Sequence, residues 1–242
     1  MKKQILAVFM LFTLMTIPSN LFGQEENNTQ EPLDQDFAIW GRVIVKKHIV
    51  SGLSASINGE FRTKENSSEF DRWRVNPELQ FKFNDYFDVS AGYIYYRTNK
   101  TTHYQGHHRW YGAVRMAIGV GPVKIHLRER FEQTIKEDME PGTYGRIYNY
   151  LRSRLGAEVK LENLPITPYA NVENFLYVFE YKGGEVAEMR YTAGLKYKFA
   201  KIHTIDLYYR IVQPLPTTEL THVMGIDYTI SLSVYGHEGI SG

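Results

Sequence analysis

The stretch DRWRVNPELQFKF, residues 71–83, alternates almost without error between apolar and polar side chains. The odd positions from Trp73 to Phe83 are apolar, whereas the even positions from Arg72 to Lys82 are polar or charged. Successive side chains of a β-strand point to opposite faces, so this segment predicts a strand with one apolar and one polar face. The same pattern recurs along most of the chain behind an export signal. This combination predicts an outer-membrane β-barrel, apolar toward lipid and polar toward its lumen.

The N-terminal residues are typical of a secretory signal peptide. Lys2 and Lys3 precede an apolar run from Ile5 to Ile17, which predicts a signal peptide over 1–23. This run is shorter than the about 20 apolar residues that a spanning helix needs. Residues 24–36 are polar and acidic and predict a flexible leader. Residues 37–235 then form one barrel domain, and 236–242 are a short tail that the barrel does not explain.

The composition of the 242 residues agrees with this fold and excludes several functions. The 18 Tyr and 13 Phe suit the aromatic girdles that a barrel carries at its two membrane interfaces. The sequence contains no Cys, which excludes disulfides and thiolate chemistry. Its formal net charge of +1 points to no particular partner, and the chain lacks the basic arm that would suggest nucleic-acid binding.

Alternation and turn signals predict eleven candidate strands and no helix. The candidate strands are 37–46, 53–64, 69–83, 86–98, 106–119, 122–134, 146–161, 167–180, 186–199, 203–213 and 220–234. Short connections such as Asn84-Asp85 alternate with longer polar ones such as 135–145. Barrels have short periplasmic turns and long outer loops, so this alternation places Asn84-Asp85 in the periplasm and Glu137–Pro141 outside.

The odd number of candidates conflicts with the even strand number of single-chain bacterial barrels. We therefore predict an all-β, antiparallel, up-and-down transmembrane β-barrel of about ten strands. Residues 37–46 would then be an extra segment that could fold into the lumen. A barrel of twelve strands, one of them missed, is the alternative.

The strand phases assign each side chain to lipid or lumen. The outward set is apolar and includes Val89, Val114, Leu195 and Leu207. Glu129 is a charged exception on this face: either it lies near the outer membrane interface, or a bulge shifts the strand register there. The lumen set holds 17 basic and 9 acidic residues: Glu60, Arg62, Arg72, Arg74, Glu78, Lys82, Asp88, Arg109, Arg115, Lys124, Arg128, Arg130, Glu132, Arg146, Arg152, Arg154, Glu158, Lys160, Glu173, Glu188, Arg190, Lys196, Lys198, Asp206, Arg210 and Asp227.

Arginine dominates the outer half of this predicted lumen. Three Arg-x-Arg pairs, at 72/74, 128/130 and 152/154, each place two guanidinium groups on one face about 7 Å apart. Basic rings give pores their anion selectivity, and guanidinium groups suit carboxylates and phosphates. The candidate selectivity residues are Arg72, Arg74, Arg109, Arg128, Arg130, Arg152, Arg154, Arg190 and Arg210.

An ordered set of short motifs adds a family resemblance. The motifs are Trp40 in the opening segment, GEFR (59–62), GYIYYR (92–97), HRWY (108–111), RERFE (128–132), RSRL (152–155), PYANVENF (168–175), RYTAGLKY (190–197) and DLYYR (206–210). Together they resemble the DUF2490 family of small outer-membrane barrels, common in Bacteroidota, over most of 37–234. The function of that family is uncharacterised, so the resemblance implies a fold and a location and no catalytic residue.

We predict a small porin-like pore of the Gram-negative outer membrane that passes anionic solutes through its arginine-rich lumen. In the first alternative the narrow lumen is filled by paired Arg and Glu side chains, and no solute passes. The barrel then has a structural role or docks a partner, for instance through the acidic loop with Glu137, Asp138 and Glu140. In the second alternative the barrel is a lipid- or peptide-modifying enzyme that uses His103, His107 or His108.

The sequence gives little support to enzymatic or metal chemistry. Gly-x-Ser-x-Gly, phosphate-loop and His-Glu-x-x-His motifs are missing from it, and the histidines at 103–108 have no carboxylate or Cys at ligand spacing. We therefore expect no enzymatic activity, no cofactor and no metal. The expected partners are outer-membrane lipid and small anionic solutes; protein partners stay open.

Overall fold

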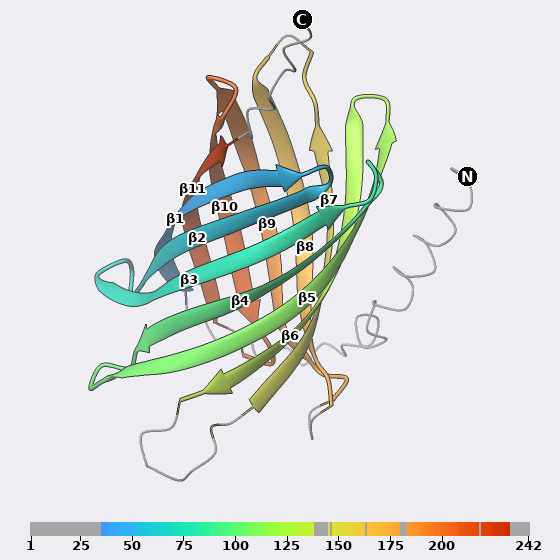
Figure 1. The fold of residues 1–242 in the computed structure, drawn as a ribbon. Coiled ribbons are helices and arrows are strands. Elements are labelled where there is room, and N and C mark those ends of the chain that lie inside the picture. Colours follow the sequence, from blue (N-terminus) through green and yellow to red (C-terminus); the bar gives the residue numbers. More distant parts are fainter. Residues whose placement is uncertain are drawn as a thin grey trace, which may run out of the picture.

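The computed structural model describes residues 35–137, 145, 147–162, 164–179, 183–217 and 219–232. Eleven strands in this part of the chain close into a barrel (Figure 1). They are β1 (Gln35–Val50), β2 (Leu53–Lys64), β3 (Glu69–Lys82), β4 (Phe87–Asn99), β5 (Tyr104–Val120), β6 (Val123–Lys136), β7 (Ile147–Val159), β8 (Ile166–Tyr177), β9 (Val186–Phe199), β10 (His203–Pro214) and β11 (Leu220–Leu232).

The ten predicted strands from 53 to 234 are confirmed as β2 to β11, with shifts of a few residues at their ends. β2 and β9 have the predicted bounds. The predicted signal peptide, residues 24–34 of the leader, Asp138 and Glu140 of the acidic loop, and residues 233–242 lie outside the described residues. No helix in the described ranges is long and apolar enough to cross a membrane.

The predicted strand number and the predicted role of 37–46 are both wrong. Residues 37–46 lie within β1, which is a full wall strand: it pairs antiparallel with β2 and parallel with β11. In Figure 1 the blue β1 lies beside the dark red β11. The barrel therefore has eleven strands, neither ten nor twelve, and one of its pairs is parallel. An odd number of strands cannot close with antiparallel neighbours throughout, so the parallel pair is the physical solution.

A salt bridge and an apolar cluster reinforce the seam between β1 and β11. Arg42 and Asp227 are register partners across the seam, and their side chains form an ion pair. Ala38 and Val223, also register partners, are buried together with Trp40 in a cluster that includes Tyr208 and Val212. The seam is therefore packed on the lumen side as well as hydrogen-bonded along its backbone.

The predicted alternation of faces is confirmed. Large apolar side chains point outward and are exposed, among them Val43, Ile57, Leu79, Leu195 and Leu207. Charged residues of the predicted lumen set that the structure describes, such as Glu60, Arg62, Arg152 and Glu173, are buried on the inward face. Glu129 points outward in an unbroken register with β5 and β7, so a bulge does not explain it; its carboxylate accepts a hydrogen bond from Ser153 Oγ, 2.5 Å away.

The connections fall into two groups at opposite ends of the barrel. One end carries the short turns, including residues 51–52, 83–86 and 121–122. The other end, called the long-loop end here, carries the connections 65–68, 100–103 and 137–146 and the two after β8 and β10. β1 begins at the long-loop end, because Gln35 pairs with Leu220, the first residue of β11.

The parallel seam can be tested by cysteine crosslinking, because the chain has no Cys of its own. Ile39 and Met224 are register partners and both are exposed. Register partners on adjacent strands have Cα atoms about 5 Å apart, which lies within the range of about 4.4–6.8 Å that a disulfide tolerates. We expect the double variant Ile39→Cys with Met224→Cys to form an intramolecular disulfide on mild oxidation, seen as a mobility change on non-reducing gels.

Pairing Ile39→Cys with Leu207→Cys gives the matched control, since Leu207 also points outward but lies on β10. This control should stay reduced under the same conditions. The absence of a crosslink in the Ile39–Met224 pair would contradict the seam, and a crosslink in the control alone would place β1 beside β10 instead of β11.

Candidate functional site

The strand alternation brings the arginines of eight strands to one lumen. Arg42 comes from β1, Arg62 from β2, Arg74 from β3, Arg109 from β5 and Arg130 from β6. β7, β9 and β10 contribute further arginines at their inward positions. Two cavities that share part of their walls lie among these side chains.

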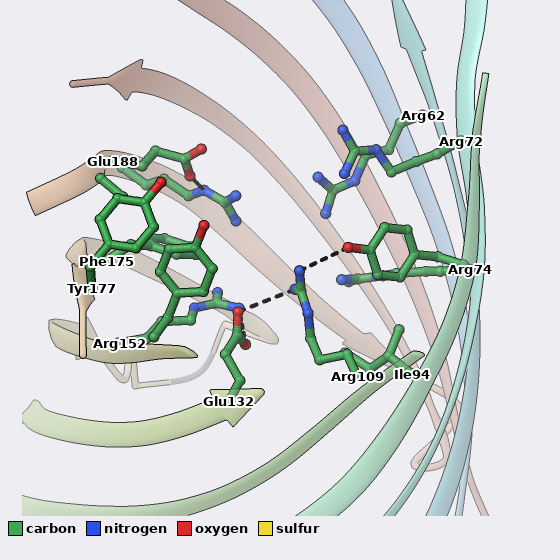
Figure 2. A pocket seen from close by; sticks show the side chains of 14 residues that line it. Arg62, Arg72, Arg74, Ile94, Arg109, Glu132, Arg152, Phe175, Tyr177 and Glu188 are labelled. Atoms are coloured by element: carbon green, nitrogen blue, oxygen red, sulfur yellow. Dashed lines mark hydrogen bonds and ion pairs between the residues drawn. The ribbon is translucent and has the colours of Figure 1, made fainter. Parts of the chain in front are cut away.

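The first cavity, the outer pocket, has a volume of about 250 Å³ and lies toward the long-loop end. Figure 2 shows Arg62, Arg72 and Arg74 on one side of it and Arg152, Phe175 and Tyr177 on the other. Among its described lining residues are six arginines and two glutamates: Arg62, Arg72, Arg74, Arg109, Arg152, Arg190, Glu132 and Glu188.

The second cavity, the central chamber, has a volume of about 370 Å³. Its described lining residues include ten cationic side chains and three carboxylates. The cations are Arg42, Lys46, Arg62, Arg74, Arg128, Arg130, Arg152, Arg154, Arg190 and Arg210, and the carboxylates are Glu60, Glu78 and Glu173. The positive groups therefore exceed the negative ones by a wide margin in a small volume.

Three buried carboxylates are each shared between two or three arginines. Glu173 on β8 pairs with Arg128, with Arg152 at 3.1 Å and with Arg154 at 3.6 Å. Its side chain is only 4% exposed. The same arrangement recurs at Glu60, whose oxygens lie 2.5 Å from nitrogens of Arg62 and of Arg74, and at Glu132, which bridges Arg109 and Arg152. These shared contacts connect β2 to β3. Separately, they connect β5, β6, β7 and β8 into one network.

Aromatic rings lie in cation–π contact with several guanidinium groups. The Arg62 guanidinium lies 3.6 Å from the centre of the Trp40 ring, and those of Arg152 and Arg190 lie 4.1 Å and 4.4 Å from the Phe175 ring. Such contacts stabilise a cation while leaving its N–H edges available to acceptors. The arginines are therefore positioned before any ligand enters.

The structure brings all nine predicted selectivity residues to these two cavities. Arg72 and Arg109 line the outer pocket, and Arg128, Arg130, Arg154 and Arg210 line the central chamber; Arg74, Arg152 and Arg190 line both. The sequence analysis missed Arg42 and Lys46, because it left residues 37–46 outside the wall. Their even positions on an alternating segment were the signal that could have identified them. Arg146, in the predicted lumen set, lies outside the described residues.

Another cavity lies at the short-turn end and differs in charge. It has a volume of about 1000 Å³, and its lining includes Asp85, Lys124, Glu158, Lys160 and Glu162. The Lys82 ammonium donates a hydrogen bond to the Asp85 carboxylate, which lowers the pKa of that carboxyl below its usual value. Acidic and basic groups are nearly balanced here, so the positive charge is concentrated in the other two cavities.

The histidines of 103–108 do not form one cluster. His107 points inward and stacks on Tyr96 with ring centres 4.4 Å apart, whereas His108 points outward, where it contacts the Tyr93 hydroxyl and lies 2.9 Å from Glu137. Similar Tyr–His pairs join β10 and β11, at 209/222 and 228/203, so the contact is a repeated feature of the outer surface. No three His, Cys, Asp or Glu side chains gather in a metal-binding arrangement in the described ranges.

Comparison with known proteins gives one family match and several distant structural likenesses, two of which are described below. Residues 37–214, from β1 to the end of β10, match the family model described as "Protein of unknown function (DUF2490)". No curated protein matches the chain. The beta domain of the Bordetella autotransporter Brka is similar with a TM-score of 0.43 and 9% identity, over 75% of this chain and 82% of that one. The siderophore receptor PirA from Pseudomonas aeruginosa is similar with a TM-score of 0.29 and 10% identity, over 74% of this chain and 34% of that one.

The ion-pair network predicts a strong effect of removing Glu173. The change Glu173→Gln leaves Arg128, Arg152 and Arg154 without their shared counter-charge, and breaking a buried pair costs about 3–5 kcal/mol. We expect the free energy of unfolding in urea to fall by this amount. Glu185→Gln, at an exposed position in the β8–β9 connection, is the control and should change it little. Equal stability of the two variants would show that the network contributes nothing.

Proposed function

This chain belongs to the DUF2490 family of proteins of unknown function, and on that premise we propose that it is an outer-membrane barrel that passes small anionic solutes. The observation that carries the proposal is the central chamber, with ten cationic side chains facing three carboxylates. A Gram-negative outer membrane is the location that this fold favours, since closed barrels are the strand architecture that spans that membrane.

The outer surface of the barrel supports a place in lipid. Leu207 is 55% exposed, Ile57 and Val43 are each 52% exposed, and further large apolar side chains continue around the wall. A water-soluble protein rarely exposes so extensive an apolar surface. The strands hold 12 to 17 residues, more than the about 9–11 that cross the hydrocarbon core, so the barrel is tall enough to span it.

The charges of the lumen support anions as the solute class. Cations entering the central chamber meet a large excess of guanidinium groups, whereas anions meet donors that aromatic rings already hold in place. Guanidinium groups bind carboxylates and phosphates with paired hydrogen bonds. The outer pocket and the chamber share Arg62, Arg74, Arg152 and Arg190, so the same groups serve both cavities.

A second candidate function is a filled structural barrel, and the buried ion pairs favour it. Glu132 and Glu173, with side chains 1% and 4% exposed, connect β5 through β8 by contacts between arginines and carboxylates. In this case the pairs fix strand register and no solute passes. The enzyme alternative has less support, because His107 and His108 lie on opposite faces of β5.

Single-channel recording separates these functions. In a planar bilayer with a salt gradient, we expect the protein to conduct with a reversal potential that favours anions. Arg130→Ser should move this potential toward zero, because Arg130 lines the chamber and its nearest carboxylate, Glu78, is 3.8 Å away. Arg97→Ser removes an outward arginine at the end of β4 and should leave it unchanged. A silent bilayer with verified insertion would favour the filled barrel.

Surface labelling tests the orientation that we propose, with the long-loop end outside. A membrane-impermeant maleimide should label Ser67→Cys, in the β2–β3 connection, on intact cells. It should label Asp85→Cys, in the β3–β4 turn, only after the outer membrane is opened. Each variant then carries a single Cys, because the chain has none of its own. The opposite pattern would place the short turns outside.

A further inference from the structure

We propose that the central chamber is a binding site for a phosphate-type oxyanion, as inorganic phosphate or a small phosphate monoester, with Arg130, Arg154 and Arg210 as its main contacts. This inference rests on the proposed function and deepens it: the lumen would hold one particular class of anion. Three observations carry it: the charge of the chamber, its unsatisfied donors and the weak pairing of those three arginines.

The first observation is the charge imbalance. Ten cationic side chains and three carboxylates surround a volume of about 370 Å³. Three further carboxylates, Asp227, Glu132 and Glu188, pair with Arg42, Arg152 and Arg190 from outside this lining, so ten cations face six carboxylates and an excess of positive charge remains. Like charges at such short distances repel one another strongly in a protein interior, because the effective dielectric constant is far below that of water. Water molecules in the chamber can accept hydrogen bonds from the arginines, but they cannot neutralise them. An anion does both.

The second observation concerns hydrogen-bond donors. The Nε–H groups of Arg74, Arg128, Arg130, Arg152 and Arg154 are buried and donate to no acceptor in the described part of the protein. The Arg152 side chain is only 8% exposed, so its donor has little access to bulk solvent. Buried donors of this kind usually have partners. The chamber therefore has an excess of donors for which the described chain supplies no acceptor.

The third observation identifies the arginines with the weakest partners. Arg154 lies 3.6 Å from Glu173, farther than either other arginine of that group, and Arg130 lies 3.8 Å from Glu78. Arg210 forms no ion pair within the described residues; it donates to Thr192 Oγ1 at 2.9 Å and lies over the Tyr208 ring. Each of the three lines the chamber, and each can therefore turn donors toward a ligand.

The number of donors favours phosphate over other small anions. Three guanidinium groups present more N–H donors than the two oxygens of a carboxylate can accept, and chloride brings a single charge. A phosphate monoester brings about −1.5 to −2 charges at pH 7 and three strongly accepting oxygens. The volume of the chamber lies at the lower end of the about 300–1,000 Å³ range of small-molecule sites, which suits a ligand of this size.

Thermal unfolding of the full-length protein in detergent tests the proposal. We expect inorganic phosphate or glucose 6-phosphate to raise the unfolding temperature by several degrees in a saturable way, compared with chloride and succinate at matched ionic strength. The two probes separate free phosphate from a phosphate ester as the ligand. The combined variant Arg154→Gln and Arg210→Gln should lose this shift. Arg115→Gln should keep it, because Arg115 pairs with Asp88 and does not line the chamber.

Equilibrium dialysis of the unaltered protein against radiolabelled phosphate and glucose 6-phosphate makes the test independent of how well the variants fold. Saturable binding near one ligand per barrel, reduced by the other phosphate compound and unaffected by chloride, would support the site. The absence of saturable binding for both probes, or an equal thermal shift with succinate, would overturn it. Anion-selective conductance without phosphate binding would overturn this inference alone, whereas phosphate binding by a silent barrel would overturn the proposed passage alone.

Discussion

The closure of the sheet by β1 against β11 is the constraint on which the rest of this structure depends. A sheet edge left unpaired in lipid would expose backbone donors and acceptors that nothing in the hydrocarbon can satisfy. Closing eleven strands requires one parallel pair, and the seam supplies it. The same pairing brings Arg42 to Asp227 and places Trp40 where the guanidinium groups of Arg62, Arg190 and Arg210 lie over its ring. The lumen chemistry therefore depends on the seam.

Much of the fold could be predicted from the sequence, because alternation is a local property. The pattern at 71–83 requires only that neighbouring side chains point to opposite faces, and it assigned Arg72, Arg74 and Glu78 to the lumen as the structure has them. Turn residues such as Asn84-Asp85 and Gly121-Pro122 marked the strand ends for the same reason.

The seam and the site could not be predicted in the same way. Pairing between Gln35 and Leu220 joins residues far apart in the sequence, and the usual even strand number favoured leaving residues 37–46 out of the wall. The partners of the arginines were equally hidden. Nothing local distinguishes Glu173, which is shared by three arginines, from Glu188, which pairs with Arg190. The division of the lumen into two cavities follows from side-chain packing between strands, which alternation does not describe.

The structural ion pairs and the proposed anion passage require different properties of the same arginines. Glu60 and Glu173 hold Arg62, Arg74 and Arg152 against the wall, so the barrel does not need a ligand to keep those side chains in place. The excess arginines remain for an anion, yet conduction requires that binding be weak enough for release. The outer pocket lies next to the chamber and shares four of its arginines. An anion that enters the outer pocket would therefore lie close to the anion bound in the chamber and repel it, which is how adjacent sites speed release through a pore.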